Sequence, residues 1–259
     1  MKPVVIVIGG TDSSGGAGVS RDVATLTELG CEARPVITAV TAQTNAAVHA
    51  VMAIPPHQVA APLSAALATG QVSAVKTGML HSAQTITALT SILKGFGRLP
   101  LVIDPVLVSS SGTQLLAPDA IAAIKQHLLP LCTLVTPNMP EASMLTGSQT
   151  AEIQAKSLLD CGAGAVLIKG GHGIGDRSVD RLFQENKPTI ESSNPRLNAT
   201  LRGTGCMLAS AIAAYLSRGK DATEACSLAT DFVFDKLHRA ESWSQSVAGL
   251  FDHAGRSEQ

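Results

Sequence analysis

The sequence lacks several features that mark common classes of protein. Lysine and arginine form no cluster in the 259 residues, and a formal net charge of −1 leaves no basic excess for binding nucleic acid. No apolar run approaches the roughly 20 residues needed to cross a bilayer, and the first one ends too early for a signal peptide. We therefore expect no nucleic-acid partner, no membrane and a cytoplasmic location.

Recognisable metal and disulfide patterns are also missing. The five cysteines are scattered and include no CxxC pair: Cys31, Cys132, Cys161, Cys206 and Cys226. An odd number at such spacings indicates neither a disulfide framework nor a structural zinc site, so we expect reduced thiols. The seven histidines show no metal-binding spacing either, and one Trp with one Tyr cannot form a stacking platform for bases.

Apolar segments of two kinds are abundant and alternate along the chain. Short β-branched runs without polar alternation predict parallel strands covered on both faces, at 3–9, 35–41, 72–78, 100–106, 132–138 and 165–171. Ala- and Leu-rich segments with helical spacing lie at 60–70, 83–97, 117–131 and 151–162. This alternation predicts an α/β fold with helices on both faces of a mostly parallel sheet. Without a linker or a repeat, we expect a single domain over residues 1–259.

Two segments depart from the alternation. Residues 178–193 resemble two short strands around a polar turn, which predicts an antiparallel edge of the sheet. The chain becomes polar after Arg239, and we expect the tail beyond about 240 to fray.

Small and polar residues follow the predicted strands. In open α/β sheets, ligands bind beyond the carboxyl ends of the strands. The segments there are 9–12, 41–43, 76–79, 104–105, 136–138 and 169–171. Any one of them could be an ordinary turn, but together they predict a ligand site at this edge.

The first of these segments opens a glycine-rich turn over residues 9–23. Its glycines let backbone N–H groups approach a ligand, and Asp12 or Asp22 could accept a hydrogen bond from it. The turn fits neither GxGxxG nor GxxxxGK[ST], so neither a dinucleotide fold nor a P-loop is indicated. A merely flexible turn remains the alternative.

A second glycine stretch, Gly203-Thr204-Gly205-Cys206, begins an apolar helix that we expect to end near Gly219. Free N–H groups and the positive end of the helix dipole predict an anion site. The same field should make the Cys206 thiol more acidic than usual. An anion site beside a proton acceptor is what phosphoryl transfer requires. A helix cap followed by a buried thiol is the alternative.

Two further segments carry candidate ligands. Asn138 and Glu141, three residues apart at the entry of a short helix, could hold a hydrated Mg²⁺. Alternatively, Asn138 is only the helix cap. Lys169 ends a strand before two glycines and could meet a phosphate, although such a lysine is often only solvated.

Seven motifs occur here in the order found in a known family, between Val4 and Leu216. They are GGTDSSGGAG, TAVTAQT, VKTGML, DPV with SSSG and LL, TPNMPEASMLTG, VLIKGGH with GD and SVD, and GTGCMLASAIAA. As a set they resemble the hydroxymethylpyrimidine/phosphomethylpyrimidine kinases of thiamine biosynthesis, in the ribokinase-like superfamily. The resemblance implies a three-layer α/β/α fold, ATP and Mg²⁺ as cofactors, and a homodimer. It also implies phosphorylation of the hydroxymethyl group of an aminopyrimidine and then of the monophosphate.

The resemblance also implies roles for individual residues. Most ribokinase relatives have aspartate as the base at this helix start, whereas this family has GTGC, which implies Cys206. Gly203, Thr204 and Gly205 would form the anion hole. The implied pyrimidine pocket consists of Gln43, which would pair with the aminopyrimidine, together with Gly10, Asp22 and Met79. The implied magnesium and ATP-phosphate ligands are Asn138, Glu141 and Lys169, with Asp104 nearby.

The sequence departs from the family pattern in three places. Ser110 stands where a lysine is usual, Leu201-Arg202 replaces Thr-His, and Thr44 and Asn45 are exchanged. Arg202 could replace some of the lost charge. We expect these changes to affect the second phosphorylation more than the first, and pyrimidine binding least.

Two other functions stay open from the sequence. A kinase for another heteroaromatic alcohol such as pyridoxal would share the fold, and a non-catalytic binding protein could have kept the pocket. Cys206 argues against the latter, because a sensor needs no proton acceptor.

Overall fold

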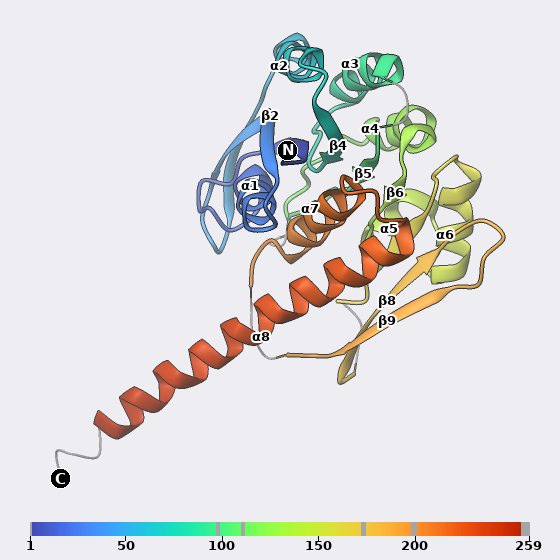
Figure 1. Cartoon of the computed structure of the whole chain (residues 1–259). Coiled ribbons are helices and arrows are strands. Elements are labelled where there is room, and N and C mark those ends of the chain that lie inside the picture. The colour runs from blue at the N-terminus through green and yellow to red at the C-terminus, as the bar shows by residue number, and fades with distance from the viewer. Residues whose placement is uncertain (1, 97–98, 110–111, 172–174, 198–200, 255–259) are drawn as a thin grey trace.

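The computed structural model describes residues 2–96, 99–109, 112–171, 175–197 and 201–254, with side chains as far as residue 242. Its strands form a nine-stranded sheet in the order β3-β2-β1-β4-β5-β6-β7-β8-β9 (Figure 1). The strands are β1 (Val4–Gly10), β2 (Glu32–Gln43), β3 (Val48–Ala53), β4 (Val72–Thr77), β5 (Leu101–Ile103), β6 (Leu134–Val135), β7 (Val166–Ile168), β8 (Arg177–Phe183) and β9 (Ile190–Pro195). In this order, the strands β2, β1, β4, β5, β6 and β7 run parallel to one another. β3 pairs antiparallel with β2, β8 with β7, and β9 with β8.

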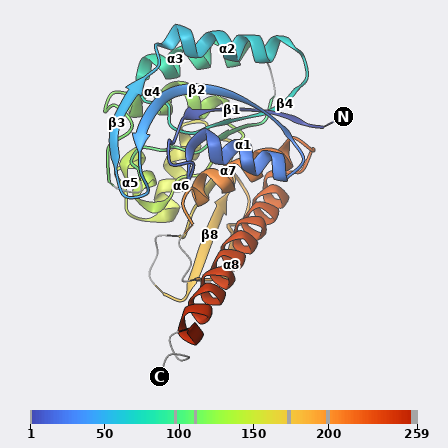
Figure 2. The same ribbon diagram turned by 90° about the vertical axis from the view of Figure 1, so that its left-hand side faces the viewer.

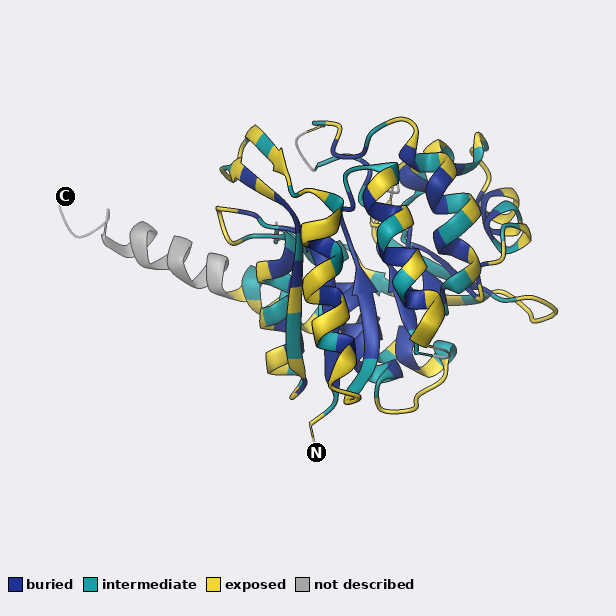
Figure 3. Cartoon of the chain, turned by 90° about the horizontal axis from the view of Figure 1, so that it is seen from above, coloured by how far each residue is buried: buried dark blue, intermediate teal, exposed yellow. Residues whose placement is uncertain are grey.

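Helices cover both faces of the sheet (Figures 2 and 3). They are α1 (Gly18–Glu28), α2 (Pro56–Ala68), α3 (Ala83–Leu93), α4 (Ala120–Ala123), α5 (Met139–Thr146), α6 (Ala151–Asp160), α7 (Thr204–Leu216) and α8 (Ala222–Ala254). Short 3₁₀ or π turns add η1 (Lys94–Phe96), η2 (Ile124–Leu128) and η3 (Leu129–Leu131). Among the described helices, none combines the length and the apolar character needed to cross a membrane.

The alternation of side chains along β1 produces the three layers. Ile6 and Ile8 belong to the core beneath α2 to α6, and Val5 and Val7 to the core beneath α1, α7 and α8. Successive residues of a strand point to opposite faces, so a continuously apolar strand must be covered twice. This confirms the predicted three-layer α/β/α fold.

The structure differs from the sequence-based prediction at one element. The antiparallel pair predicted within 178–193 is present as β8 and β9, but β3 was not predicted. β3 is a partly exposed edge strand, and VHAVMA lacks the continuous apolar character that identified the buried strands. At the other end of the chain, α8 continues as far as Ala254, and the expected fraying of the tail stays a prediction.

Candidate active site

The carboxyl ends of the parallel strands border a cavity of about 580 Å³, which we call the larger cavity. Every site residue predicted from the sequence lines it: Gly10, Asp22, Gln43, Met79, Asp104, Asn138, Glu141, Lys169, Gly203, Thr204, Gly205 and Cys206. Parallel strands bring their carboxyl ends to one edge, which is why segments far apart in sequence meet here.

The N-terminus of α7 forms one wall of this cavity. The first hydrogen bond across the N-cap runs from the Met207 N–H to the Gly203 carbonyl at 2.8 Å. The N–H groups of Thr204, Gly205 and Cys206 therefore precede the helical ladder, as in any first turn. Gly203 adopts φ 74°, and a Cβ there would lie 2.4 Å from the Gly16 carbonyl oxygen. Only glycine suits this position, and it joins the start of α7 to the glycine-rich turn.

Cys206 lies partly buried at the start of α7. Gly18, Lys76 and Asp104 line the larger cavity together with it. Burial raises the pKa of the Cys206 thiol to about 12; Lys76 opposes the rise, while Asp22 and Asp104 add to it. The prediction of an unusually acidic thiol is therefore wrong for the protein without substrate. Desolvation and two nearby carboxylates outweigh the helix N-terminus.

Beneath the thiol lies a buried ion pair that was not predicted from the sequence. Lys76 Nζ is 2.8 and 2.9 Å from the two carboxylate oxygens of Asp22, and both side chains are 1% exposed. The Ser210 hydroxyl also donates to Asp22, at 2.8 Å. Burial alone would lower the pKa of Lys76, but the carboxylates of Asp22 and Asp104 and the neighbouring Cys206 raise it above its usual range. A lysine inside the otherwise apolar run VSAVKTG was the available signal.

The partners of Asp22 limit its predicted role. Asp22 lines the cavity as predicted, but Lys76 and Ser210 already bond to its carboxylate. Its proposed contact with a ligand stays a prediction. The structure assigns it a clear task, which is to hold a cation beside Cys206.

A second charged cluster surrounds Lys169. Its ammonium lies 2.9 Å from Asp104 Oδ1 and 3.7 Å from Glu141 Oε2. Despite burial, Lys169 and Lys76 lower the pKa of Asp104, whereas burial raises the pKa of Glu141. Lys169 is therefore not the solvated lysine of the alternative interpretation.

Asn138 caps α5 in a reciprocal arrangement with Glu141. Its side-chain oxygen accepts the Glu141 N–H at 2.8 Å, and Glu141 Oε2 accepts the Asn138 N–H at 2.8 Å. This capping box fixes the Glu141 carboxylate beside Lys169. The capping role of Asn138, which the sequence left as an alternative, is present, and metal ligation by Asn138 stays a prediction.

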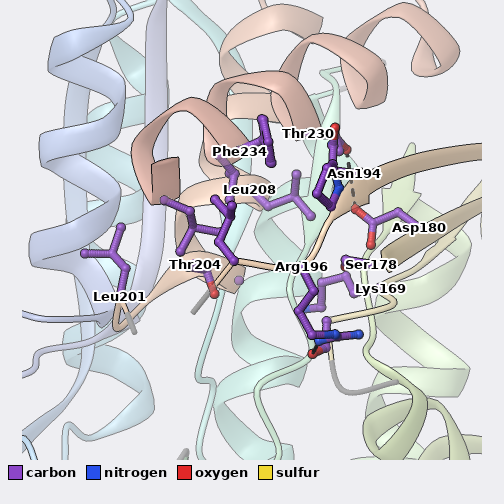
Figure 4. A pocket seen from close by; sticks show the side chains of 16 residues that line it. Lys169, Ser178, Asp180, Asn194, Arg196, Leu201, Thr204, Leu208, Thr230 and Phe234 are labelled. Atoms are coloured by element: carbon purple, nitrogen blue, oxygen red, sulfur yellow. Dashed lines mark hydrogen bonds between the residues drawn. The ribbon is translucent and has the colours of Figure 1, made fainter. Parts of the chain in front are cut away.

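Figure 4 shows the residues that line a smaller cavity of about 310 Å³, which adjoins the larger one. Both are lined by Lys169, Gly171, Leu201, Thr204 and Gly205. The remaining wall is mainly apolar on the α8 side and polar on the β8–β9 side; it includes Leu208, Val233, Phe234, Leu237, Ser178, Asp180 and Asn194. This cavity was not predicted from the sequence, because its apolar lining residues form no motif.

Asp180 of β8 lines the smaller cavity and connects β8 to the segment that follows β7. Its carboxylate accepts the Gly170 N–H at 2.8 Å and the Thr230 hydroxyl at 3.4 Å. Burial raises the pKa of Asp180. Gly170 follows Lys169, so this bond helps to hold the lysine that both cavities share.

The departures from the family pattern can be placed only in part. Ser110 lies outside the described residues. Arg202 lines the larger cavity and forms an ion pair with Asp12, with Nη2 3.5 Å from Oδ2. This carboxylate balances its charge, so Arg202 is a poor replacement for the missing lysine.

Comparisons with known proteins agree with this geometry. A family model described as phosphomethylpyrimidine kinase matches residues 12–249. The chain is 40% identical over 248 residues to the hydroxymethylpyrimidine/phosphomethylpyrimidine kinase of Rhizobium meliloti, covering 93% of this chain and 92% of that protein. It is also 40% identical to a thiamine biosynthesis bifunctional protein of Geobacter sulfurreducens, covering 92% of this chain but only 49% of that protein.

Solved structures of two kinds of kinase have a similar fold. A phosphomethylpyrimidine kinase from Clostridium difficile is 34% identical with a TM-score of 0.78, covering 91% of this chain and 99% of that one. A Staphylococcus aureus pyridoxal kinase is 30% identical with a TM-score of 0.83, covering 92% and 88%. Other structures of the latter kinase contain ADP or AMP-PCP.

Proposed function

The chain belongs to the phosphomethylpyrimidine kinase family, and we propose that it phosphorylates 4-amino-5-hydroxymethyl-2-methylpyrimidine with ATP in thiamine biosynthesis. The monophosphate formed would be the second acceptor. One observation carries this proposal: two cavities meet at Lys169, Thr204 and Gly205, with Cys206 lining only the larger one. Phosphoryl transfer needs a donor and an acceptor roughly in line, on either side of a site that stabilises the moving group.

We assign ATP to the smaller cavity and the pyrimidine to the larger one. Apolar side chains of α8 offer a surface for a nucleobase, and the N-terminus of α7 lies toward the phosphates. In the larger cavity, Gln43 presents an amide that can both donate to and accept from an aminopyrimidine edge. Lys169 and the first N–H groups of α7 would then stabilise the transferring phosphoryl group.

Cys206 would accept the proton of the attacking hydroxyl as a thiolate. Lys76 favours the thiolate electrostatically, whereas burial disfavours it. Because the thiol must lose its own proton before it can act as this base, turnover should increase as pH rises.

The donor set around Lys169 fits Mg²⁺. Two buried carboxylates, Asp104 and Glu141, face one ammonium, which leaves an excess of negative charge and hard oxygen ligands. Asp104 and Glu141 would hold the ion, with Asn138 as the third candidate. When bound, the ion would neutralise charge on the phosphates.

The proposal is tested by an ATP-consumption assay with hydroxymethylpyrimidine, its monophosphate and pyridoxal offered in parallel. We expect turnover with the first two acceptors. Turnover with pyridoxal alone would assign the larger cavity to a different alcohol, and no turnover with any of them would contradict a kinase.

Replacing Gln43 by alanine should weaken pyrimidine binding by about 1–3 kcal/mol, because paired polar groups lose their partner. The measurement is the KM for hydroxymethylpyrimidine at saturating ATP. Gln126→Ala on the exposed side of η2 is the control, and it should leave this KM unchanged. An unchanged KM for Gln43→Ala would remove Gln43 from pyrimidine recognition.

We also propose that the chain is one domain, cytoplasmic, and a homodimer. The nine strands of one sheet support the first of these statements. Light scattering tests the last one, with a mass near twice 26.6 kDa expected.

A further inference from the structure

Arg202 connects three loops at the larger cavity. Its Nη1 donates to the Ser14 hydroxyl at 2.7 Å, the Asn45 side-chain oxygen at 3.1 Å and the Thr44 carbonyl at 3.2 Å. Nη2 lies 3.5 Å from Asp12 Oδ2. One guanidinium therefore joins the turn after β1, the turn after β2 and the segment that begins α7.

These contacts lie on both sides of Gln43. Thr44 and Asn45 follow Gln43 directly. On the other side, the Gln43 N–H donates to the Ser13 hydroxyl at 2.7 Å, and that hydroxyl donates back to the Gln43 carbonyl at 2.8 Å. Ser13 stands between the two residues of its turn that contact Arg202, Asp12 and Ser14. The backbone of Gln43 is thus held by Ser13 on one side, and Arg202 contacts both the neighbours of Ser13 and the two residues that follow Gln43.

Burial indicates that Arg202 is a fixed part of the wall. Its side chain is 18% exposed and that of Asp12 is 3% exposed. Within the described part of the chain, Arg202 Nε and Asp12 Oδ2 have no hydrogen-bond partner. A buried charge pair with unused hydrogen-bonding capacity costs free energy. Such a pair is more readily explained by positioning than by a contribution to stability.

Two of the departures from the family pattern meet at this point. Arg202 replaces the usual histidine, and its contacts are with the exchanged pair Thr44 and Asn45. The two changes lie far apart in sequence and in direct contact in space.

We propose that Arg202 is a positioning residue that fixes the Gln43 segment against the glycine-rich turn and thereby sets the affinity for the acceptor alcohol. It acts through Gln43 and its supports and does not itself bind a phosphate. The identity of the acceptor rests on the proposed function; the positioning role applies to whichever alcohol the larger cavity accepts.

The test compares Arg202→Ala and Arg202→Lys with wild type in steady-state kinetics. We expect Arg202→Ala to raise the acceptor KM about tenfold, with a smaller change in kcat and no change in the KM for ATP. Arg202→Lys should recover only part of this loss, because an ammonium cannot form the planar, multi-pronged contact of a guanidinium. Arg34→Ala is the matched control, since Arg34 also connects separate elements, β2 and α2, but lies outside both cavities.

Asn45→Ala provides a second, milder variant. It should raise the same KM about threefold, and the double variant with Arg202→Ala should show less than the product of the two effects.

If Arg202→Ala does not fold, the acceptor KM values of Arg202→Lys and Asn45→Ala still test the proposal. Unchanged acceptor KM values, or a loss confined to the monophosphate, would overturn the proposal, the latter by making Arg202 a phosphate ligand. If wild type is active on a different alcohol only, the proposed function fails and the positioning test is repeated with that alcohol.

Discussion

Replacing Cys206 by alanine is expected to lower kcat at pH 7 by about 10²–10⁴-fold, the usual contribution of a general base. Affinity for the pyrimidine should be nearly unchanged, because the proposed recognition of the pyrimidine is by Gln43 at the end of β2. Fixed-time product assays measure kcat, and calorimetric titration with the pyrimidine measures its affinity. Wild-type kcat in Cys206→Ala would remove the thiol from the mechanism.

The pH dependence of this reaction follows from the environment of the thiol. Burial raises the pKa of Cys206 to about 12, so the thiolate is scarce at pH 7. Its fraction grows with pH, and kcat/KM should rise about tenfold per unit through the neutral range. Cys206→Asp, which places the aspartate of most ribokinase relatives here, starts from a much lower reference pKa, so in the same surroundings it should be ionised at lower pH than the thiol and give a less steep profile. A wild-type plateau below pH 8 would contradict a thiol base in this environment.

Replacing Lys76 by methionine is expected to lower the free energy of unfolding by about 3–5 kcal/mol, because Asp22 is left as an unpaired buried charge. Urea unfolding at pH 7 measures this loss. Lys156→Met is the control: its partner Asp160 is 3.1 Å away, but the two side chains are 76% and 63% exposed. Such a surface pair contributes only about 0–1 kcal/mol.

A double variant separates charge from packing. Lys76→Met with Asp22→Asn removes both charges and should recover part of the loss, because no ion is then left unpaired. In the wild type, the raised pKa of Lys76 means that its stabilising contribution is complete below the unfolded pKa of about 10.4 and is lost only as pH rises through the folded pKa. A cost below 1 kcal/mol for Lys76→Met would show that the pair is not an important support.

The sequence predicts this site better than it predicts the chemistry inside it. Cys206, Lys169 and Gln43 could be brought together because parallel strands end at one edge, a rule that needs no side-chain detail. The acidity of Cys206 could not be obtained in this way. Its pKa depends on burial and on two carboxylates, Asp22 in α1 and Asp104 directly after β5, whereas the helix rule concerns α7 alone.

The same reasoning explains the elements that were missed. Lys76 was visible at a strand end, but its partner lies 54 residues earlier in α1. The smaller cavity uses Phe234 and neighbouring apolar residues of α8, which in sequence are indistinguishable from residues that cover a core. β3 is a half-exposed edge, where the pattern of a buried strand does not apply.

The two edges of the sheet line different cavities. Residues of β2, which pairs with the antiparallel β3, line only the larger cavity, whereas those of β8 and β9 line only the smaller. With ATP in the smaller cavity and the alcohol in the larger one, as we propose, substitutions at one edge could admit a new alcohol while the opposite edge still bound the nucleotide. A single fold could in this way come to phosphorylate different vitamin precursors with an unchanged binding site for the phosphate donor.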